Sequence, residues 1–364
     1  AYVLNPEPDV EEAVAAGREV LAWYLESGLP DELTEVLALE GLRAPSLARD
    51  GAPTIEAELM EYGPMRRIAL AESARLWYAI DAGDAAMAAN ASSNLFGLME
   101  LAESQPLLIS LLVRVSIGAV ASERIEESIR AGTMTPEVAR ALLPQYRAWV
   151  AAEPARTRVH IEADALLLRI WLNDLYAGTI DGSMVSVPAT RIFWLNHKRI
   201  DEKATAYFDD ILAYVNEGPV AHDAPDIPWD TTSRLSELRH TPLSLLLPAM
   251  DRSARNIFQW RVELNAVLAH LAIAVYEEDR GELPASLDDL VGAGLLDALP
   301  ADTFSTDGVM NYRPDPNAVG GFELWSDGKD QIDNNAAGPP WPQRIDELMQ
   351  GDDAMFPRND EAGG

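Results

Sequence analysis

Apolar residues recur at helical spacing over most of the chain. Between residues 9 and 218, positions separated by three or four residues repeatedly carry Val, Leu, Ile, Ala or an aromatic side chain. This period is typical of amphipathic helices that bury one face. We therefore expect successive helices with short breaks, over residues 9–27, 65–82, 85–103, 106–132, 135–152, 155–178 and 188–216.

Three short signals support the predicted helix boundaries. Gly83 suits the left-handed position at the end of one helix, and Asp84 can cap the start of the next. The surrounding segment AIDAGDAAMAA resembles the junction of a tetratricopeptide-like repeat, without the aromatic positions of that consensus. Thr135 followed by Pro136 is a strong start signal, because Thr caps and Pro fits the first helical position.

The last long helix is expected from residue 243 to residue 279. One stripe of this helix is apolar and could bind a terminal module to the helical body; its members are Ile257, Trp260, Leu264, Leu268, Leu271 and Val275. Residues 180–187 read as a small hairpin or only a turn, and the Pro-rich stretch at 217–232 as a boundary or surface loop. A short helix is expected at 343–350.

These patterns predict a mainly α protein. The helices would form antiparallel hairpins in an α-solenoid or tetratricopeptide-like array, followed by a small α+β module with a two- to four-stranded antiparallel sheet. The expected division is a helical domain over residues 1–240, a long helix plus sheet module over 241–338, and a tail over 339–364.

Composition narrows the possible partners. The net charge of −31, from 59 acidic and 28 basic residues, opposes binding to nucleic acid or to an anionic membrane surface. The absence of cysteine excludes disulfides and thiolate chemistry. The longest apolar stretch, residues 106–121, is too short to span a bilayer and contains Arg114, so we expect no transmembrane segment.

Sequence motifs for catalysis are missing. The chain has no HExxH, no GxSxG and no P-loop. Among its histidines, His160 lies four residues before Asp164, so on a helix the two side chains are neighbours. They could share a metal or a hydrogen bond, or form an ordinary pair on the helix surface.

An acidic loop near the C-terminus is the best candidate site. Ser326, Asp327, Asp330 and Asp333 fall within eight residues, and Gly328 allows a tight turn. Calcium takes six to eight oxygen ligands from carboxylates and carbonyls, which such a loop can supply. The alternative is a solvated turn that its Asp side chains hold by hydrogen bonds to the backbone.

The segment from residue 265 to 335 resembles the C-terminal part of the major (G-type) pseudopilin of type II secretion. In that family a helix ends in Tyr-x-x-Asp-x-Gly-x-Tyr-Pro, and a Leu-rich helix, a Pro-x-Asp-Pro-Trp/Phe turn, a short sheet and a Ser-x-Gly-x-Asp calcium loop follow. The matching residues are Tyr276, Asp279, Gly281, Pro284, Leu287, Leu290, Leu295, Leu296, Pro300, Asp302, Phe304, Tyr312, Phe322, Ser326, Gly328 and Asp330.

This resemblance implies a calcium ion held by Asp330 and Ser326, with Leu324 offering its carbonyl. Two positions depart from the family pattern: Gln331 stands where the family has Gly, and Thr303 where it has Pro. The whole chain also resembles uncharacterised exported helical proteins of planctomycete-type bacteria, in which LLPA-x-x-R-A opens the last long helix. The segment LLLPAMDRSAR is similar to it.

We therefore expect a non-catalytic exported scaffold or protein-binding subunit with a calcium-ordered C-terminal module. Its location would be periplasmic or secreted, as the resemblance and the start AYVLNP without Met suggest. Its partners would be proteins, and the oligomeric state is left open. The alternatives are a hydrolase of exported polymers with a carboxylate site among the helices, or a fixed subunit of a larger assembly.

Overall fold

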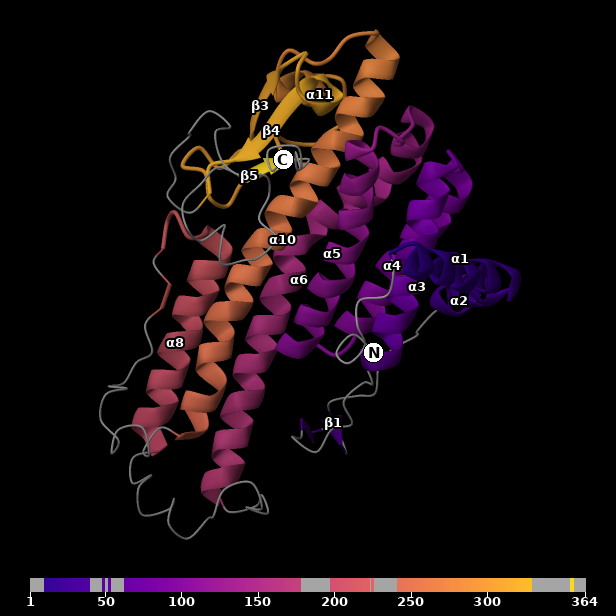
Figure 1. Cartoon of the computed structure of the whole chain (residues 1–364). Coiled ribbons are helices and arrows are strands. Elements are labelled where there is room, and N and C mark those ends of the chain that lie inside the picture. Colours follow the sequence, from indigo (N-terminus) through magenta and orange to yellow (C-terminus); the bar gives the residue numbers. More distant parts are fainter. Residues whose placement is uncertain are drawn as a thin grey trace.

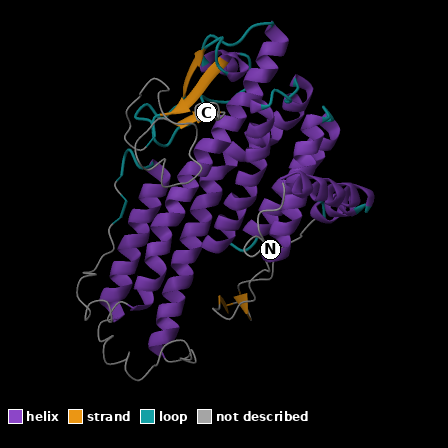
Figure 2. Ribbon diagram, viewed as in Figure 1, coloured by secondary structure: helices purple, strands orange, loops and turns teal. Residues whose placement is uncertain are grey.

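The protein is mainly helical, with a small antiparallel sheet near the C-terminus (Figures 1 and 2). The structure is a computed structural model. It describes residues 10–39, 48–49, 52–53, 62–177, 197–222, 224–225, 241–328 and 354–356. The expected hairpin at 180–187 and the expected helix at 343–350 lie outside these residues.

The first half contains two helical pairs that cross each other (Figure 1). Helices α1 (Val10–Glu26) and α2 (Leu29–Leu37) lie across α3 (Tyr62–Asp81) and α4 (Ala85–Glu103). The predicted α3–α4 turn is confirmed: Gly83 has a φ of 67°, and the Asp84 side chain accepts a hydrogen bond from the amide of Met87. Strands β1 (Ala48–Arg49) and β2 (Ala52–Pro53) form a separate small hairpin.

Helix α2 was missed by the sequence reasoning. Gly28, with a φ of 77°, separates it from α1, and Pro30 occupies its first turn together with Asp31 and Glu32. Proline and acidic residues are both favoured at this end of a helix. The start signal was thus present. The helix was missed because its nine residues are too few to show a clear apolar period.

Two long helices follow, and the second corrects the prediction. Helix α5 runs from Leu108 to Arg130, close to the expected bounds. Helix α6 is continuous from Pro136 to Ala177, whereas a break before residue 155 was expected. Its interior prolines, Pro144 and Pro154, each remove a backbone hydrogen bond. The helix continues because one buried stripe runs past both of them, including Leu143, Tyr146, Trp149, Glu153, Thr157 and Ile161.

Helices α8 (His197–Glu217) and α10 (Thr241–Arg280) complete the helical body. The expected start of α8 at residue 188 lies outside the described residues. Helix α10 lies beside α5, α6 and α8 (Figure 1). The whole predicted stripe of α10 is buried, which explains its apolar pattern. The stripe of α10 belongs to one hydrophobic core together with residues more than a hundred positions earlier in the chain.

The C-terminal module is built on the second half of α10 (Figure 2). It contains α11 (Leu287–Gly292), β3 (Asn311–Pro314), a 3-10 turn η2 (Val319–Gly321), β4 (Phe322–Ser326) and β5 (Ala354–Phe356). The strands are antiparallel in the order β3-β4-β5. Ser286 and Asp289 form a reciprocal capping box that starts α11.

A hydrogen bond and two ring contacts are among the interactions that join the module to α10. The amide of Ala301 donates to the side-chain oxygen of Asn265 over 3.1 Å. The ring of Phe304 meets Phe258 edge to face at 6.4 Å, and Phe322 lies 5.3 Å from the ring of His270. These contacts place the module on the helical body, with the start of β4 beside α10.

Candidate functional site

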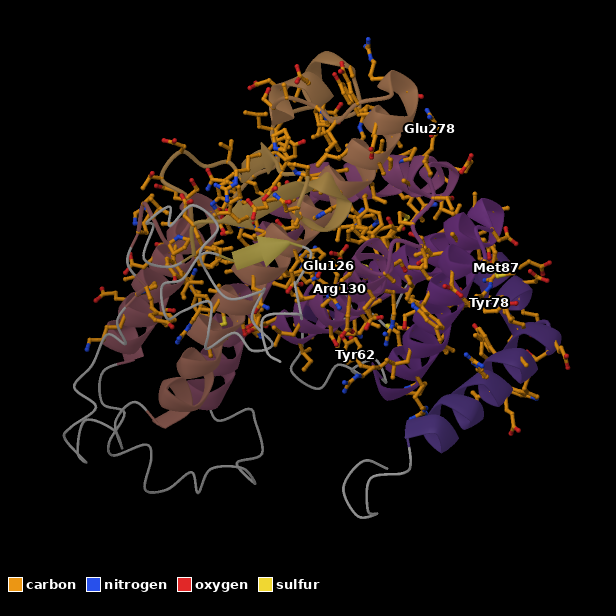
Figure 3. All side chains as sticks on the ribbon, turned by 45° about the horizontal axis from the view of Figure 1, so that its top comes forward. Tyr62, Tyr78, Met87, Glu126, Arg130 and Glu278 are labelled. Atoms are coloured by element: carbon orange, nitrogen blue, oxygen red, sulfur yellow. The ribbon has the colours of Figure 1, made fainter. Side chains whose placement is uncertain are left out.

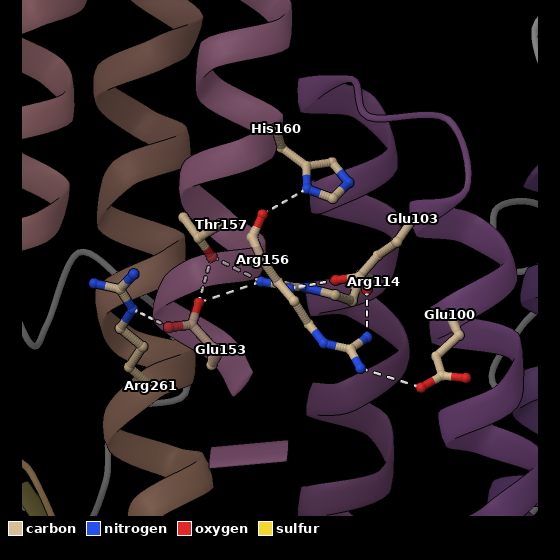
Figure 4. A network of polar contacts seen from close by, with 8 residues as sticks. All are labelled: Glu100, Glu103, Arg114, Glu153, Arg156, Thr157, His160 and Arg261. Atoms are coloured by element: carbon tan, nitrogen blue, oxygen red, sulfur yellow. Dashed lines mark hydrogen bonds and ion pairs between the residues drawn. The ribbon is translucent and has the colours of Figure 1, made fainter. Parts of the chain in front are cut away.

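A buried cluster of arginines and glutamates lies where α4, α5, α6 and α10 meet (Figure 4). The Arg114 side chain on α5 is fully buried. Its guanidinium donates to Glu103, to Glu153 at 3.2 Å and to the Thr157 hydroxyl at 2.9 Å. It also lies over the ring of Trp260, 4.9 Å from the ring centre. Arg114 thus connects α5 to residues on three other helices, α4, α6 and α10.

Two further arginines extend this cluster. Arg261 on α10 donates to the second carboxylate oxygen of Glu153 and to the backbone carbonyl of Val215 on α8. Arg156 on α6 donates to Glu103 over 2.6 Å and to Glu100 over 3.1 Å. Three arginines therefore face three glutamates, so the charges of the cluster balance. Such balance is needed because an unpaired buried charge is costly.

The chemistry of this cluster is structural. Both carboxylate oxygens of Glu103 and Glu153 accept hydrogen bonds from arginines. A general acid or base needs a carboxylate oxygen that is free to face a substrate. The two glutamates instead neutralise the guanidinium groups, and the cluster holds five helices in register.

His160 does not form the pair with Asp164 that its spacing allowed. The imidazole is buried, so the surface-pair interpretation is wrong. Its Nδ1 donates to the carbonyl of Arg156 over 2.8 Å, while the Asp164 carboxylate accepts from the amide of Leu108 over 3.3 Å. Burial lowers the pKa of His160, and burial raises that of Asp164. His160 and Asp164 thus make separate hydrogen bonds, His160 within α6 and Asp164 to the start of α5.

A second polar network attaches α1 and α2 to the body, and sequence reasoning missed it. The Tyr24 hydroxyl donates to Glu72 over 2.6 Å, and Arg75 and Asn94 both donate to the other carboxylate oxygen of Glu72. Asn94 also donates to the carbonyl of Pro30 on α2. Burial and the bond to Glu72 raise the pKa of Tyr24 far above its usual range, so the phenol stays a donor.

Glu126 on α5 is a buried carboxyl group that the sequence did not single out (Figure 3). Burial raises its pKa well above the usual range, and the nearby Glu263 carboxylate on α10 raises it further. A raised pKa is one property of a general acid, but catalysis also needs a base with a separated pKa facing the same cleft. Glu126 is better described as a buried core residue whose pKa is raised by burial and by Glu263.

The predicted calcium ligands lie at the end of β4. Leu324 and Ser326 are fully buried within the strand, and Asp327 follows it directly. The carboxylate of Asp327 accepts a hydrogen bond from the side chain of Asn311 on β3. The other two predicted ligands, Asp330 and Asp333, lie outside the described residues.

Asp302 joins this end of β4, although the sequence matched it only to a turn. One carboxylate oxygen accepts from the amide of Phe304 over 2.9 Å, and the other accepts from the amide of Asp327 over 3.2 Å. Ser326 also hydrogen-bonds to Asp302. Burial raises the pKa of Asp302 from 3.8 to about 6, against the lowering effect of these hydrogen bonds. The Asp302 carboxyl is thus poised to respond to pH or to a cation.

The oxygen chemistry at this point fits a hard cation. Asp302, Asp327 and Ser326 bring two carboxylates and a hydroxyl together, which are ligand types that calcium prefers. Within the described part of the chain, no three His, Asp or Glu side chains form a metal-binding group. A complete calcium shell would therefore also need oxygens from the predicted ligands Asp330 and Asp333.

Asp302 predicts a dependence of stability on pH. Because its folded pKa is raised above the unfolded value, the folded state binds the proton more tightly, and stability should fall as pH rises from about 4 to about 6. A shift of this size corresponds to roughly 3 kcal/mol of unfolding free energy. Urea denaturation in calcium-free buffer at several pH values would measure the slope. In Asp302→Asn the slope over this window should become smaller by the contribution of Asp302, and an unchanged slope would assign it to other groups.

A groove lies on the surface between the start of α3 and the first half of α5. Its volume is about 340 Å³, and none of the described residues that line it carries a carboxylate. The Tyr62 hydroxyl lies 2.6 Å from that of Ser110 beside this groove, and Figure 3 shows the position of Tyr62. The lining residues are Tyr62, Gly63, Arg66, Leu112, Val113, Ser116 and Ile117.

Comparisons with known proteins yield no relative from which a function could be carried over. No family model matches the chain, and no curated protein or solved structure matches it. None of the helices in the described ranges is both long enough and apolar enough to cross a membrane.

Proposed function

We propose that this protein is a non-catalytic, exported scaffold that binds protein partners through its helical body. The groove between α3 and α5 carries this proposal, because it is open and mainly apolar, and no carboxylate is found among the described residues that line it. A hydrolase of charged or sugar polymers would place an acid and a base in its cleft. The buried carboxylates of Glu103 and Glu153 are instead occupied by arginines.

Exposed apolar side chains next to the groove support the same proposal. Leu70 and Trp77 on α3 are 46% and 40% exposed, and Ile109 on α5 is 48% exposed. Arg66, Leu70 and Trp77 follow one another at helical spacing, so they continue the groove along one face of α3. Large apolar side chains that gather at one surface indicate a protein-binding site.

A photo-crosslinking amino acid at Ser116 would test this proposal in the producing cells. Ser116 lines the groove and is exposed, so the substitution should leave the core intact. We expect a discrete heavier adduct from Ser116 and none of the same mass from the control position Thr306, an exposed residue of the C-terminal module. The absence of any crosslinked adduct from Ser116 would contradict the proposal.

The proposed location and arrangement of the scaffold rest on the resemblance of residues 265–335 to the major pseudopilin. We propose that the helical hairpins act as a solenoid-like array and that the C-terminal module is a pseudopilin-like cap. The capped helix α11 and the antiparallel pair β3–β4 after a long helix support the second point. Cell fractionation should find the protein in the periplasm or medium, and a solely cytoplasmic pool would contradict export.

Calcium is the proposed ion of this cap. The convergence of Ser326, Asp327 and the buried Asp302 supports it, and Leu324, Asp330 and Asp333 complete the proposed ligand set. Calcium would favour the ionised form of Asp302, which burial alone disfavours. The bound ion would therefore hold the end of β4 against the loop that carries Asp302.

Calcium is expected to stabilise the native protein. A ligand that binds only the folded state at a hundred times its Kd adds about 2.7 kcal/mol, so millimolar calcium should raise the melting temperature, whereas magnesium and chelator should not. The variant Asp330→Ala should lose this response. The matched control Asp307→Ala changes an exposed aspartate of the same module and should retain it. An equal response in both variants would contradict the proposed ligand set.

A further inference from the structure

The groove between α3 and α5 lies in an acid-free part of a strongly acidic chain. The chain carries 59 acidic residues, yet none occurs from residue 62 to residue 71 or from residue 104 to residue 122. These two segments form the two walls of the groove. Among the described residues, those that line the groove include one charged side chain, Arg66, and its charge is opposite to the net charge of −31.

Two adjacent arginines supply this local positive charge. Arg66 lines the groove, and Arg67 follows it on α3; both side chains are exposed. Within the described residues, neither forms an ion pair or a hydrogen bond, whereas the exposed Arg140 and Arg158 pair with Asp279 and Glu162. Unpaired arginines beside an apolar surface are typical of sites that bind carboxylates or phosphates.

The start of α3 adds to the positive potential. The amino end of a helix carries a partial positive charge, and acidic residues in the first turn usually compensate it. Helix α3 has no acidic residue in its first turn, and Tyr62 and Gly63 of this turn line the groove. An additional Cβ on Gly63 would meet no atom within 4 Å, so the backbone here is accessible from the groove.

We infer that this groove binds an acidic amphipathic segment of a partner protein. Its apolar side chains would contact Leu112, Val113 and Ile117, and its carboxylates would bind Arg66 and Arg67. The inference rests on the proposed scaffold function and names the class of partner. Charge complementarity selects this occupant, since among the described residues a basic segment would face Arg66 and Arg67 without a partner and no carboxylate.

Two designed peptides can test the inference on the full-length protein. One is a short amphipathic helix of leucine and glutamate with a fluorescent label, and the other has lysine in place of every glutamate. The net charge of −31 favours the lysine peptide at long range. A saturable preference for the glutamate peptide, measured by fluorescence anisotropy at moderate salt, therefore has to arise from a local site. This preference is the expected result.

Variants then locate the site. Arg66→Glu should weaken binding of the glutamate peptide by about tenfold or more, because it replaces an attraction with a repulsion. Arg18→Glu, a change of the same charge at another exposed arginine, which lies on α1, should leave binding unchanged. Leu112→Ala should weaken binding about fivefold through lost apolar contact. Thermal unfolding of each variant would verify that it is folded.

Three outcomes would overturn the inference. They are a preference for the lysine peptide, equal effects of Arg66→Glu and Arg18→Glu, and self-association of the free protein that Arg66→Glu abolishes, since a second copy would then occupy the groove. If Ser116 gives a crosslinked adduct but the lysine peptide is preferred, or Arg66→Glu and Arg18→Glu have equal effects, the scaffold function is retained. Only the acidic partner is then contradicted. Failure of both experiments would contradict both proposals.

Discussion

The variant Glu153→Gln should lose about 3 to 5 kcal/mol of unfolding free energy. The wild-type carboxylate accepts from Arg114 and Arg261, and its side chain is 3% exposed. Neutralising it leaves three arginines against two glutamates in the cluster, with a positive charge that water cannot solvate. Removing one partner of a buried ion pair typically has an effect of this size.

Urea denaturation followed by tryptophan fluorescence would measure this effect, because Trp260 stacks on Arg114. The matched control is Glu162→Gln on the same helix. Glu162 pairs with Arg158, and both side chains are largely exposed, so the control should change stability by less than about 1 kcal/mol. A loss in Glu153→Gln no larger than in this control would show that the buried cluster does not hold the helices together.

The variant Gly118→Ala should destabilise the protein. It adds one methyl group to α5 at a position where Trp260 leaves no room for it. A Cβ at this position would lie 2.6 Å from Nε1 of Trp260 and 2.9 Å from Cε2. Trp260 is 1% exposed and stacks on Arg114, so its ring has little room to move. Such overpacking typically costs about 1 to 3 kcal/mol, despite the better helix propensity of alanine.

The control for this prediction is Gly17→Ala on α1, where an added Cβ would meet no atom within 4 Å. That variant should be unchanged or stabilised by up to about 1 kcal/mol. A second change, Trp260→Phe in the Gly118→Ala background, should recover part of the loss, because phenylalanine lacks the ring atoms that clash. Equal melting temperatures of Gly118→Ala and Gly17→Ala would contradict the tight α5–α10 contact.

Sequence reasoning succeeded where the signal is local. The turn at Gly83 and Asp84, the cap at Thr135 and the buried stripe of α10 were all expected and are confirmed. Each depends on residues within a few positions of one another, so the backbone geometry follows from their side chains. The continuity of α6 was missed because Pro154 is a local breaking signal, and only long-range packing overrides it.

The candidate sites show the same difference between local signals, which the sequence contains, and long-range contacts, which it does not. The acidic loop was predicted at Ser326 and Asp327, since the ligands are close in the sequence. Asp302, 25 residues earlier, reaches them only through the fold of the module. The groove was not predicted at all, because its walls come from α3 and α5, and the intervening helix α4 separates them along the chain.

The sequence by itself determined that the chain is mainly helical, which face of most helices is apolar, and how acidic the chain is. These properties depend on backbone sterics and on burial patterns that repeat every few residues. Only the tertiary structure decided which charges meet. Glu153 lies 39 residues from Arg114 and 108 from Arg261, and the helix register that joins them follows from the packing of the whole core. Electrostatic energy depends on distance in space, which a pattern along the chain does not contain.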